Sequence, residues 1–441
     1  MSDGKGSLPP GWVEATLGEL CGKSQYGWTT KAAEEGMLRF LRTTDITRGP
    51  IKWGTVPFCF EPPNDVDRYL LRAGDIVVSR AGSVGFSALI DDCPPSVFAS
   101  YLIRFRPALP AMARYLVAFM RSPQYWSAIG AESAGIALAN VNAKKLSAIK
   151  VPVPPLPVQQ AIVEELDKRL AEVAVGEQLF GKALLGLDQH RTSLLHTLVR
   201  ADEVCPLGDV ADIASGLTKG RRTQEPVHAR PFLRAANVRD GLLDLEEVKT
   251  IDATDREAER FRLVEGDVLL VEGSGSPGRL GQGWVWEGQV EHCLHQNHVF
   301  RARPDKTRLL PRYLAWTLQS PAARGYFRRA SKTTSGLATI NRQQVGGLPI
   351  PLPPIRQQQY IIDELDTALA AAEALRLSLS IQMRAADVLR RTILHRAFVG
   401  ELTPQSDESA VAMMRLVAAA KSELDGGTTA PQKRRAVLAP E

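Results

Sequence analysis

Residues 151–167 read VPVPPLPVQQAIVEELD, and residues 350–366 read IPLPPIRQQQYIIDELD. Each stretch begins with closely spaced prolines, which cannot lie inside a helix but can precede one, and then continues with a helical pattern. The two stretches are 199 positions apart, and the correspondence runs without a gap to Leu195–His196 and Leu394–His395. The chain of 441 residues therefore contains two copies of one plan.

Upstream of each proline-rich stretch the two halves still correspond, although the offset changes. The pair Gly74–Asp75 returns as Gly266–Asp267, and Ser122–Pro123 returns as Ser320–Pro321. Both regions are rich in glycine and contain short apolar runs that turn residues divide. This pattern predicts mainly strands with a few helices.

The fold class that we predict is α+β, with two strand-rich domains separated by two long helices in an internal two-fold repeat. The tail mixes Pro, Ser, Gly, Lys and Arg around one short amphipathic stretch, Ala410–Ala420, so we expect most of it to be disordered. The predicted segments are a first strand-rich domain at 1–150, a long helix with its proline-rich cap at 151–204, a second strand-rich domain at 205–348, a second long helix at 349–402, and the tail at 403–441.

Each long helix carries an apolar stripe when positions are taken in alternate steps of four and three. In each copy eight of the ten stripe positions are apolar, which predicts that the two helices pair as a coiled coil. Either direction of pairing leaves one Arg–Arg contact among the polar positions Glu177, Arg191, Arg376 and Arg390, so the stripe leaves the direction open. The residues expected to pair the helices are Leu166, Leu170, Val173, Phe180, Leu184, Leu187, Leu194, Leu198, Leu365, Leu369, Leu379, Met383 and Ile393.

The positive charge is concentrated in the two strand-rich regions. The chain carries a net charge of +5, and residues 1–150 and 205–348 each contribute +4, which suits a polyanion bound at two places. Five scattered cysteines without a C-x-x-C pair indicate reduced thiols, and no apolar run could span a membrane. With no signal peptide at the N-terminus, we expect a cytoplasmic protein without membrane contact.

Three motifs suggest chemistry but have simpler interpretations. The G-x-G-x-x-G stretch 273–278 does not lead into a helix, so a hairpin loop is favoured over a nucleotide site. His292, His295 and His298 lie in a strand-like region, where they would divide between two faces, and the first copy has no equivalent ligands. The charged stretch 244–249 resembles a solvated surface more than a nuclease site. We expect no catalytic residue, no cofactor and no metal.

The order of these features resembles the specificity subunits of type I restriction-modification enzymes over roughly residues 8–405. The motifs that carry the resemblance are the helical headers PLPVQQAIVEELD and PPIRQQQYIIDELD, the ending LHRAFVGELTPQ, and the opening LPPGWVEATLGEL. The resemblance implies that each strand-rich domain is a target-recognition domain for one half of a bipartite site in double-stranded DNA. It further implies antiparallel pairing of the helices, two methyltransferase subunits docked on them, and restriction (motor-nuclease) subunits that join the complex.

Base contacts require donors and acceptors on loops held by a rigid framework, with cations near the flanking phosphates. In the first domain the candidate DNA-binding residues are Lys23, Tyr26, Trp28, Lys31, Arg42, Thr43, Thr44, Arg80, Ser83, Ser100 and Tyr101. In the second domain they are Lys219, Arg221, Arg222, Arg234, Asn237, Ser276, Arg279, Gln296 and Asn297. One departure from the repeat is that Glu272 stands where the first copy has Arg80.

Two other classes of function compete with a DNA-binding subunit. An enzyme that uses the Gly-rich loop would bind a nucleotide or S-adenosylmethionine as the isolated chain. A coiled-coil scaffold for proteins alone would leave the positive charge of both strand-rich regions unexplained. Within the DNA-binding class, a subunit that serves a methyltransferase without a nuclease is a further alternative.

Overall fold

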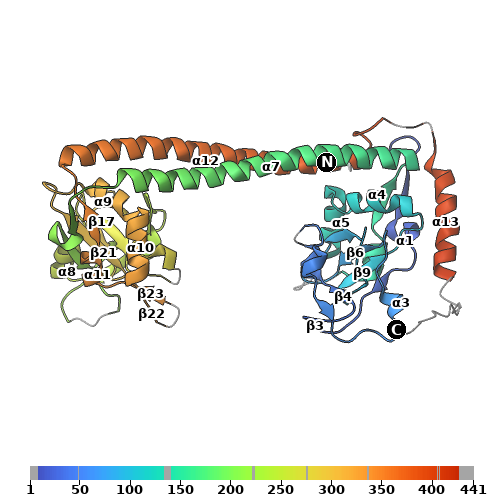
Figure 1. Ribbon diagram of the computed structural model, residues 1–441, viewed down its shortest axis with the longest axis horizontal. Coiled ribbons are helices and arrows are strands. Elements are labelled where there is room, and N and C mark those ends of the chain that lie inside the picture. The colour runs from blue at the N-terminus through green and yellow to red at the C-terminus, as the bar shows by residue number, and fades with distance from the viewer. Residues whose placement is uncertain are drawn as a thin grey trace, which may run out of the picture. The chain divides into compact units, whose positions relative to one another are not determined.

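The computed structural model describes residues 8–47, 49–133, 141–220, 224–274, 277–334, 337–404, 406 and 408–426. The chain divides into two compact units. Unit 1 consists of Met1–Gln178 and Gln382–Glu441, and unit 2 consists of Leu179–Ile381. Each unit therefore combines one strand-rich domain with part of each long helix (Figure 1).

The strand-rich domain of unit 1 contains two four-stranded sheets and a separate strand pair. The first sheet is antiparallel, in the order β2 (Gln25–Tyr26), β9 (Leu102–Phe105), β6 (Ile76–Ser79) and β7 (Ser87–Leu89). The second has the order β3 (Ala32–Ala33), β5 (Phe58–Cys59), β4 (Arg39–Leu41) and β8 (Ser96–Phe98), and its last pair is parallel. The separate pair is β1 (Val13–Thr16) with β10 (Lys150–Val153).

Short helices cover the first sheet of unit 1. Ile76, Val78 and Ile103 of the sheet are fully buried in one apolar cluster with Tyr115 and Leu116 of α4. The short helices of the whole domain are α1 (Leu17–Leu20), α2 (Thr43–Ile46), α3 (Val66–Tyr69), α4 (Ala113–Phe119), α5 (Pro123–Ser133) and α6 (Ala143–Ser147).

Unit 2 repeats this plan with additional strands. Its main sheet is antiparallel, in the order β12 (Ala211–Ser215), β21 (Val299–Pro304), β17 (Val268–Val271) and β19 (Gly283–Val285). A second sheet has the order β16 (Lys249–Ala253), β13 (His228–Leu233) and β20 (Leu294–His295). A third has the order β18 (Gly273–Ser274), β23 (Leu337–Thr339) and β22 (Lys332–Thr334). Two strand pairs complete the unit, β14 (Val238–Arg239) with β15 (Leu242–Leu243) and β11 (Val204–Pro206) with β24 (Pro349–Pro351). The helices are α8 (Asp255–Phe261), α9 (Pro311–Leu318), α10 (Pro321–Ala330) and α11 (Arg342–Gly346).

The Gly-Asp pairs of the repeat open the central strand of each main sheet. Gly74 and Gly266 have φ angles of +87° and +95°, which favour glycine, at the turns before β6 and β17. The carboxylate of Asp75 is almost fully buried and accepts two hydrogen bonds from Arg106, at 2.7 and 3.0 Å. Asp267 accepts the same pair of bonds from Arg303, at 2.6 and 2.9 Å. The same ion pair, between a buried carboxylate and a partly exposed arginine, thus fixes the same turn in both domains.

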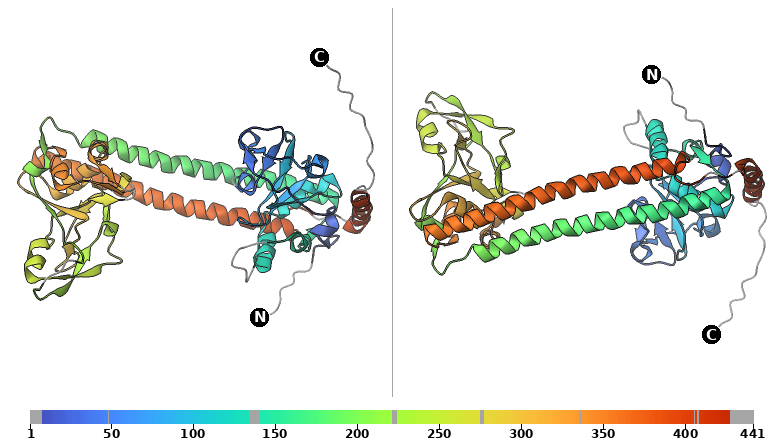
Figure 2. Two further views of the ribbon diagram at one scale, coloured as in Figure 1. Left: turned by 90° about the horizontal axis from the view of Figure 1, so that it is seen from below. Right: turned by 90° about the horizontal axis from the view of Figure 1, so that it is seen from above.

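The long helices are α7 (Leu156–Leu198) and α12 (Ile355–Phe398), and both begin directly after their proline-rich stretches. In unit 1 the first part of α7 packs beside the last part of α12, where Leu166 and Val173 share a cluster with Ile393. In unit 2 the last part of α7 packs beside the first part of α12, where Leu195 shares a cluster with Leu365. The helices are therefore antiparallel, as the family resemblance implies (Figures 1 and 2).

The contacts of the polar stripe residues explain why the sequence alone did not decide between parallel and antiparallel pairing of the helices. Glu177 forms an ion pair with Arg390, as antiparallel pairing requires. The expected Arg–Arg contact does not form, because Arg376 instead pairs with Asp188, which lies beside the stripe. Arg191 donates a hydrogen bond to Gln319 at the end of α9. Both partners lie outside the stripe, so stripe positions alone could not reveal them.

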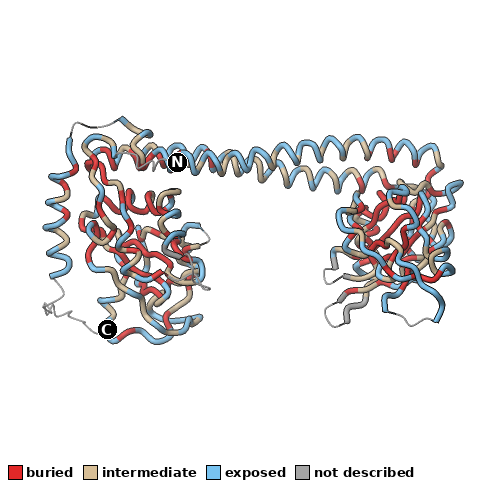
Figure 3. Tube along the Cα trace, turned by 180° about the vertical axis from the view of Figure 1, so that it is seen from behind, coloured by how far each residue is buried: buried red, intermediate tan, exposed pale blue. Residues whose placement is uncertain are grey.

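The apolar stripe is deeply buried only where a strand-rich domain covers it (Figure 3). Leu166, Val173, Leu365 and Ile393 are buried, and Met383, expected in the stripe, is 39% exposed. Two paired helices alone cannot enclose large side chains, so the side chains in the middle of the stripe remain partly exposed to solvent. The remaining expected positions are half-buried, namely Leu170, Phe180, Leu184, Leu187, Leu194, Leu198, Leu369 and Leu379.

The amphipathic stretch that the sequence shows in the tail lies in helix α13, Ala410–Gly426. Its apolar face, Ala410, Met413 and Val417, is buried in the core of unit 1. The N–H of Ala410 donates to the carbonyl of Gly11 at 2.9 Å. Residues 427–441 lie outside the described residues.

Among the described helices, none combines the length and the apolar character needed to cross a membrane.

Candidate nucleic-acid interface

Backbone hydrogen bonds gather four candidate loops of unit 1 at one end of the sheets. The N–H of Arg80 donates to the carbonyl of Tyr101 at 2.9 Å. The N–H of Ser100 donates to the carbonyl of Trp28, also at 2.9 Å. The N–H of Ala99 donates to the carbonyl of Leu41, the residue before Arg42, at 2.9 Å. Four segments that are far apart in the sequence therefore form one surface.

At this surface, an arginine lies over an aromatic ring. The guanidinium carbon of Arg80 is 5.1 Å from the ring centroid of Tyr26, a cation–π contact. The Nε of Arg80 is buried and makes no hydrogen bond to the described residues. Tyr101 beside it is 59% exposed. The surface therefore offers a positive charge and an exposed aromatic ring to a partner.

Two of the predicted side chains in unit 1 are occupied within the domain. The Nε1 of Trp28 donates to the carbonyl of Glu61 at 2.7 Å, and its ring packs edge-on against Tyr69. Arg42 donates two hydrogen bonds to Asp45, both at 3.0 Å, and these bonds raise the pKa of Arg42. These side chains hold the loops in shape.

The remaining candidate residues of unit 1 differ in their exposure and in their distance from the gathered loops. Lys23 is exposed near α13, where its backbone N–H donates to Asp425 at 2.7 Å. It therefore lies toward the opposite end of β2 from the gathered loops. Lys31, Thr44 and Ser83 are exposed, and Thr43 and Ser100 are half-buried.

Unit 2 gathers its loops with the same backbone bonds. The N–H of Glu272 donates to the carbonyl of His298 at 3.0 Å, as Arg80 does to Tyr101. The N–H of Asn297 donates to the carbonyl of Leu217 at 3.1 Å, as Ser100 does to Trp28. The N–H of Gln296 donates to the carbonyl of Leu233 at 2.9 Å, as Ala99 does to Leu41. The repeat is thus preserved in the hydrogen bonds of the candidate surface.

A glycine at the same place in each domain makes this arrangement possible. A Cβ atom on Gly27 would lie 2.2 Å from the carbonyl oxygen of Ala99, and one on Gly216 would lie 2.1 Å from that of His295. No side chain fits at such distances, so both positions require glycine. This role was not predicted from the sequence, although Gly27 lies between the candidates Tyr26 and Trp28, and Gly216 lies three residues before Lys219.

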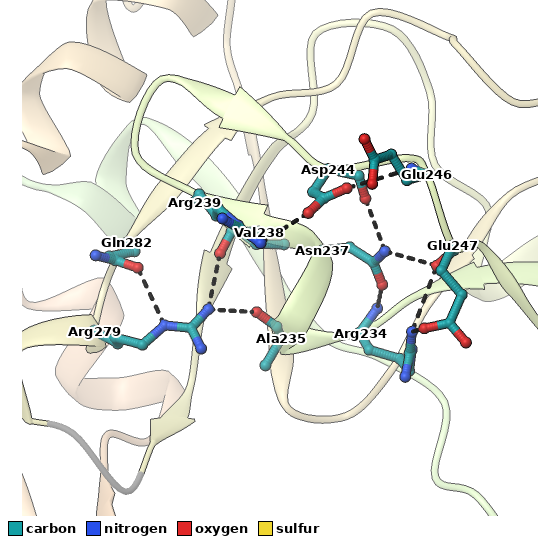
Figure 4. A network of polar contacts seen from close by, with 10 residues as sticks. All are labelled: Arg234, Ala235, Asn237, Val238, Arg239, Asp244, Glu246, Glu247, Arg279 and Gln282. Atoms are coloured by element: carbon teal, nitrogen blue, oxygen red, sulfur yellow. Dashed lines mark hydrogen bonds and ion pairs between the residues drawn. The ribbon is translucent and has the colours of Figure 1, made fainter. Parts of the chain in front are cut away.

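Several predicted residues of unit 2 form an internal polar network (Figure 4). Asn237 is buried, and its amide donates to the carbonyls of Asp244 and Glu247, at 2.8 and 3.0 Å. Arg234 pairs with the carboxylate of Glu247 at 2.9 Å. Arg279 donates to the carbonyl of Ala235 at 3.1 Å. Asn237 in particular has no free donor to offer a base, because both hydrogens of its amide are used.

Other predicted residues of unit 2 remain available to a partner. Gln296 and Asn297 are half-buried, and their side-chain amides make no hydrogen bond to another described residue. Lys219 is exposed. Arg221, Arg222 and Ser276 lie outside the described residues.

The Gly-rich and histidine-rich segments were considered as ligand sites and have other structures. Gly273 and Ser274 form β18, which pairs with β23, and a short 3-10 turn at Pro277–Arg279 follows. His295 is buried, and its Nδ1–H donates to the carbonyl of Val299 at 2.8 Å. Among the residues that the structure describes, no group of three or more His, Cys, Asp or Glu side chains could hold a metal ion.

Residues 9–178 match the family described as type I restriction modification DNA specificity domain. The EcoKI specificity subunit of Escherichia coli (strain K12) is 28% identical, over 98% of this chain and 100% of that protein. The StySPI specificity subunit of Salmonella potsdam is 24% identical, over 97% of this chain and 99% of that protein.

Two solved structures have a similar fold. A chain from a type I R-M system complex has a TM-score of 0.70 at 19% identity, covering 90% of this chain and 99% of that chain. The HsdS subunit from Thermoanaerobacter tengcongensis has a TM-score of 0.52 at 20% identity, covering 91% of this chain and 100% of that chain. Residues 9–178 thus match the type I restriction modification DNA specificity domain, and the chain as a whole is similar in sequence to two specificity subunits of type I restriction enzymes.

Proposed function

We propose that this chain is the non-catalytic, DNA-binding subunit of a type I restriction-modification complex. Each strand-rich domain binds one half of a bipartite target in double-stranded DNA. The observation that carries this proposal is the duplicated loop surface, in which Arg80–Tyr101 and Glu272–His298 make the same backbone bond in the two units. Two copies of one reading surface suit two separate short sequences better than one continuous sequence.

We propose different roles for the candidate residues according to their exposure and their contacts within the domain. Side chains available to contact bases are Thr44, Arg80, Ser83, Ser100 and Tyr101 in the first domain and Gln296 and Asn297 in the second. The hydroxyl of Tyr26 accepts from the N–H of Ala143 at 2.9 Å, so Tyr26 can offer a base only its ring. The exposed cations Lys31 and Lys219 suit flanking phosphates, where sequence is not read, whereas Lys23 lies away from the gathered loops. Trp28, Arg42, Arg234, Asn237 and Arg279 act indirectly by shaping the loops, and Thr43 is a candidate from the sequence alone. Arg221, Arg222 and Ser276 remain candidates from the sequence alone.

The long helices provide the docking surface for two methyltransferase subunits, and restriction subunits join that complex. The relatives are named as specificity subunits of type I restriction enzymes, which supports this assembly. Both helices also expose large apolar side chains that no described segment covers, such as Leu185 at 65%, Leu377 at 58% and Val388 at 62%. Exposed apolar side chains of this kind mark protein interfaces.

The test is base-resolved methylation mapping in cells that express this chain with the methyltransferase encoded beside it. We expect one two-part sequence with a fixed unread gap to be methylated, and we expect methylation to disappear when this chain is omitted. Methylation that persists unchanged without this chain, from a complex shown to assemble, would contradict the proposal and favour a protein scaffold.

A further inference from the structure

The two reading surfaces present opposite charges at one equivalent position. Arg80 and Glu272 each follow the central strand of the main sheet, β6 and β17 respectively. The N–H of Arg80 donates to Tyr101 and its carbonyl accepts from Val141, at 2.9 and 3.0 Å. The N–H of Glu272 donates to His298 and its carbonyl accepts from Ile340, both at 3.0 Å. The backbone is therefore the same, and only the side chain differs.

The surroundings of Arg80 leave its guanidinium able to donate. It lies over the ring of Tyr26, and among the described residues it forms no ion pair with a carboxylate. A guanidinium donates two parallel hydrogen bonds to guanine, which presents the acceptors O6 and N7 in the major groove. The other bases present at most one acceptor beside a donor or a methyl group, so guanine fits this side chain best.

The surroundings of Glu272 leave its carboxylate able to accept. Its Oε2 is buried without a hydrogen bond to the described residues, and the nearest partner is the Nδ1 of His298, at 3.4 Å. The side chain of Glu272 is 25% exposed. A carboxylate is repelled by phosphates and by the acceptors of guanine, thymine and the N7 of adenine. The N4 amine of cytosine is a donor without a neighbouring acceptor in the major groove, so it suits this side chain.

We propose that Arg80 and Glu272 determine the base at one equivalent position of each half-site: Arg80 binds a guanine and Glu272 binds a cytosine. This inference rests on the proposed function, because it requires that both domains bind DNA bases. It goes beyond that function by assigning the chemistry of one base in each half of the target.

The experiment compares the methylated sequences produced by wild-type, Glu272→Gln and Arg80→Gln chains, each with the methyltransferase. Glutamine has nearly the shape of glutamate but pairs with adenine. Glu272→Gln should admit adenine at one position of one half-site, with a loss of discrimination of roughly 5- to 150-fold. Arg80→Gln should relax a guanine in the other half-site. Each variant should leave the opposite half-site unchanged.

The matched controls are Glu265→Gln and Arg72→Gln, because these exposed residues precede the strands that Glu272 and Arg80 follow. Both controls should preserve the wild-type sequence. If a Glu272 or Arg80 variant abolishes methylation, binding of the purified complex to the wild-type target and to single-base changes is measured instead. Weaker binding with unchanged base preference would overturn the inference, as would unchanged methylated sequences.

Failure of this inference is distinguishable from failure of the proposed function. A wild-type complex that methylates no bipartite sequence contradicts the proposed function. A normal bipartite sequence that lacks a guanine and a cytosine responding to these variants contradicts only the assignment of Arg80 and Glu272.

Discussion

At the residue scale, His295 is a buried histidine that can hydrogen-bond through only one of its ring nitrogens. Its Nδ1–H donates to Val299, while its Nε2 is buried without a partner among the described residues. Burial lowers the pKa of His295 to about 4, although the carbonyl of Val299 partly opposes this shift. The folded domain therefore keeps the ring neutral, because a second N–H would find no acceptor.

This environment predicts that unit 2 loses stability in mild acid. Between pH 6.5 and about 4 the unfolded chain binds a proton at this histidine that the folded chain does not, so stability falls as pH falls through that window. The loss should approach roughly 3 kcal/mol at the acid end. Chemical unfolding of the full chain at several pH values measures it. His295→Gln should reduce the slope, and the exposed control His292→Gln should retain it.

Because the carboxylates of Asp75 and Asp267 are buried in equivalent ion pairs, we expect that removing either charge lowers the stability of its unit by a similar amount. Asp75→Asn leaves Arg106 without its partner and should destabilise unit 1 by about 3 kcal/mol. Asp267→Asn should do the same to unit 2 through Arg303. Thermal unfolding checks both, with the exposed Asp67→Asn as the neutral control. Equal effects of Asp67→Asn and Asp75→Asn would refute this role.

The sequence located the candidate loops but not the role of each side chain. The repeat aligned Arg80 with Glu272, and the structure places both at the same point. The sequence could not show that Asn237 and Arg279 are occupied internally. Their partners, such as Glu247 and Ala235, are determined by how the loops fold together.

At the scale of elements, the ion pair between Glu177 and Arg390 is specific to antiparallel helices. Reversing either charge should destabilise unit 1, and reversing both should restore part of the loss. Because both side chains are partly exposed, we expect a coupling energy of only about 0.5 kcal/mol. A double-mutant cycle measures this coupling, and a cycle between Arg390 and the exposed Glu172 provides the control. Equal coupling in both cycles would argue against a specific pair.

Helix α13 predicts that the C-terminal region stabilises the N-terminal domain. Met413 is buried, and its sulfur accepts a hydrogen bond from the amide of Gln159 at 3.4 Å. Met413→Ala should destabilise unit 1 by about 2–3 kcal/mol, as expected for a buried methionine. Leu416→Ala on the exposed face of the same helix should have little effect. Thermal unfolding of the two variants checks the difference.

The periodic elements were the most predictable from the sequence. Both long helices follow from the proline-rich starts and from the stripe, which repeat in the two copies. The direction of pairing was not predictable from the stripe, because Arg376 and Arg191 find partners outside it. The length of the tail helix was not predictable, because a 17-residue helix gains its stability from packing, which composition does not report.

At the scale of the whole molecule, the repeat produces two domains with one backbone plan and different side chains. The turns at Gly74 and Gly266, the ion pairs of Asp75 and Asp267, and the loop bonds all recur. The backbone framework can therefore stay constant while the side chains of the candidate loops vary. This plan could be recognised from one sequence because the chain contains it twice.

The division of unit 1 into two distant stretches of chain has a consequence for its synthesis. The first domain leaves the ribosome long before the segment that covers Leu166 and Val173, which share a cluster with Ile393. At about 5–20 residues per second, roughly 200 further residues require about 10–40 seconds. During that interval the nascent first domain exposes an apolar surface. Chaperones that bind such surfaces can therefore bind the domain before translation ends.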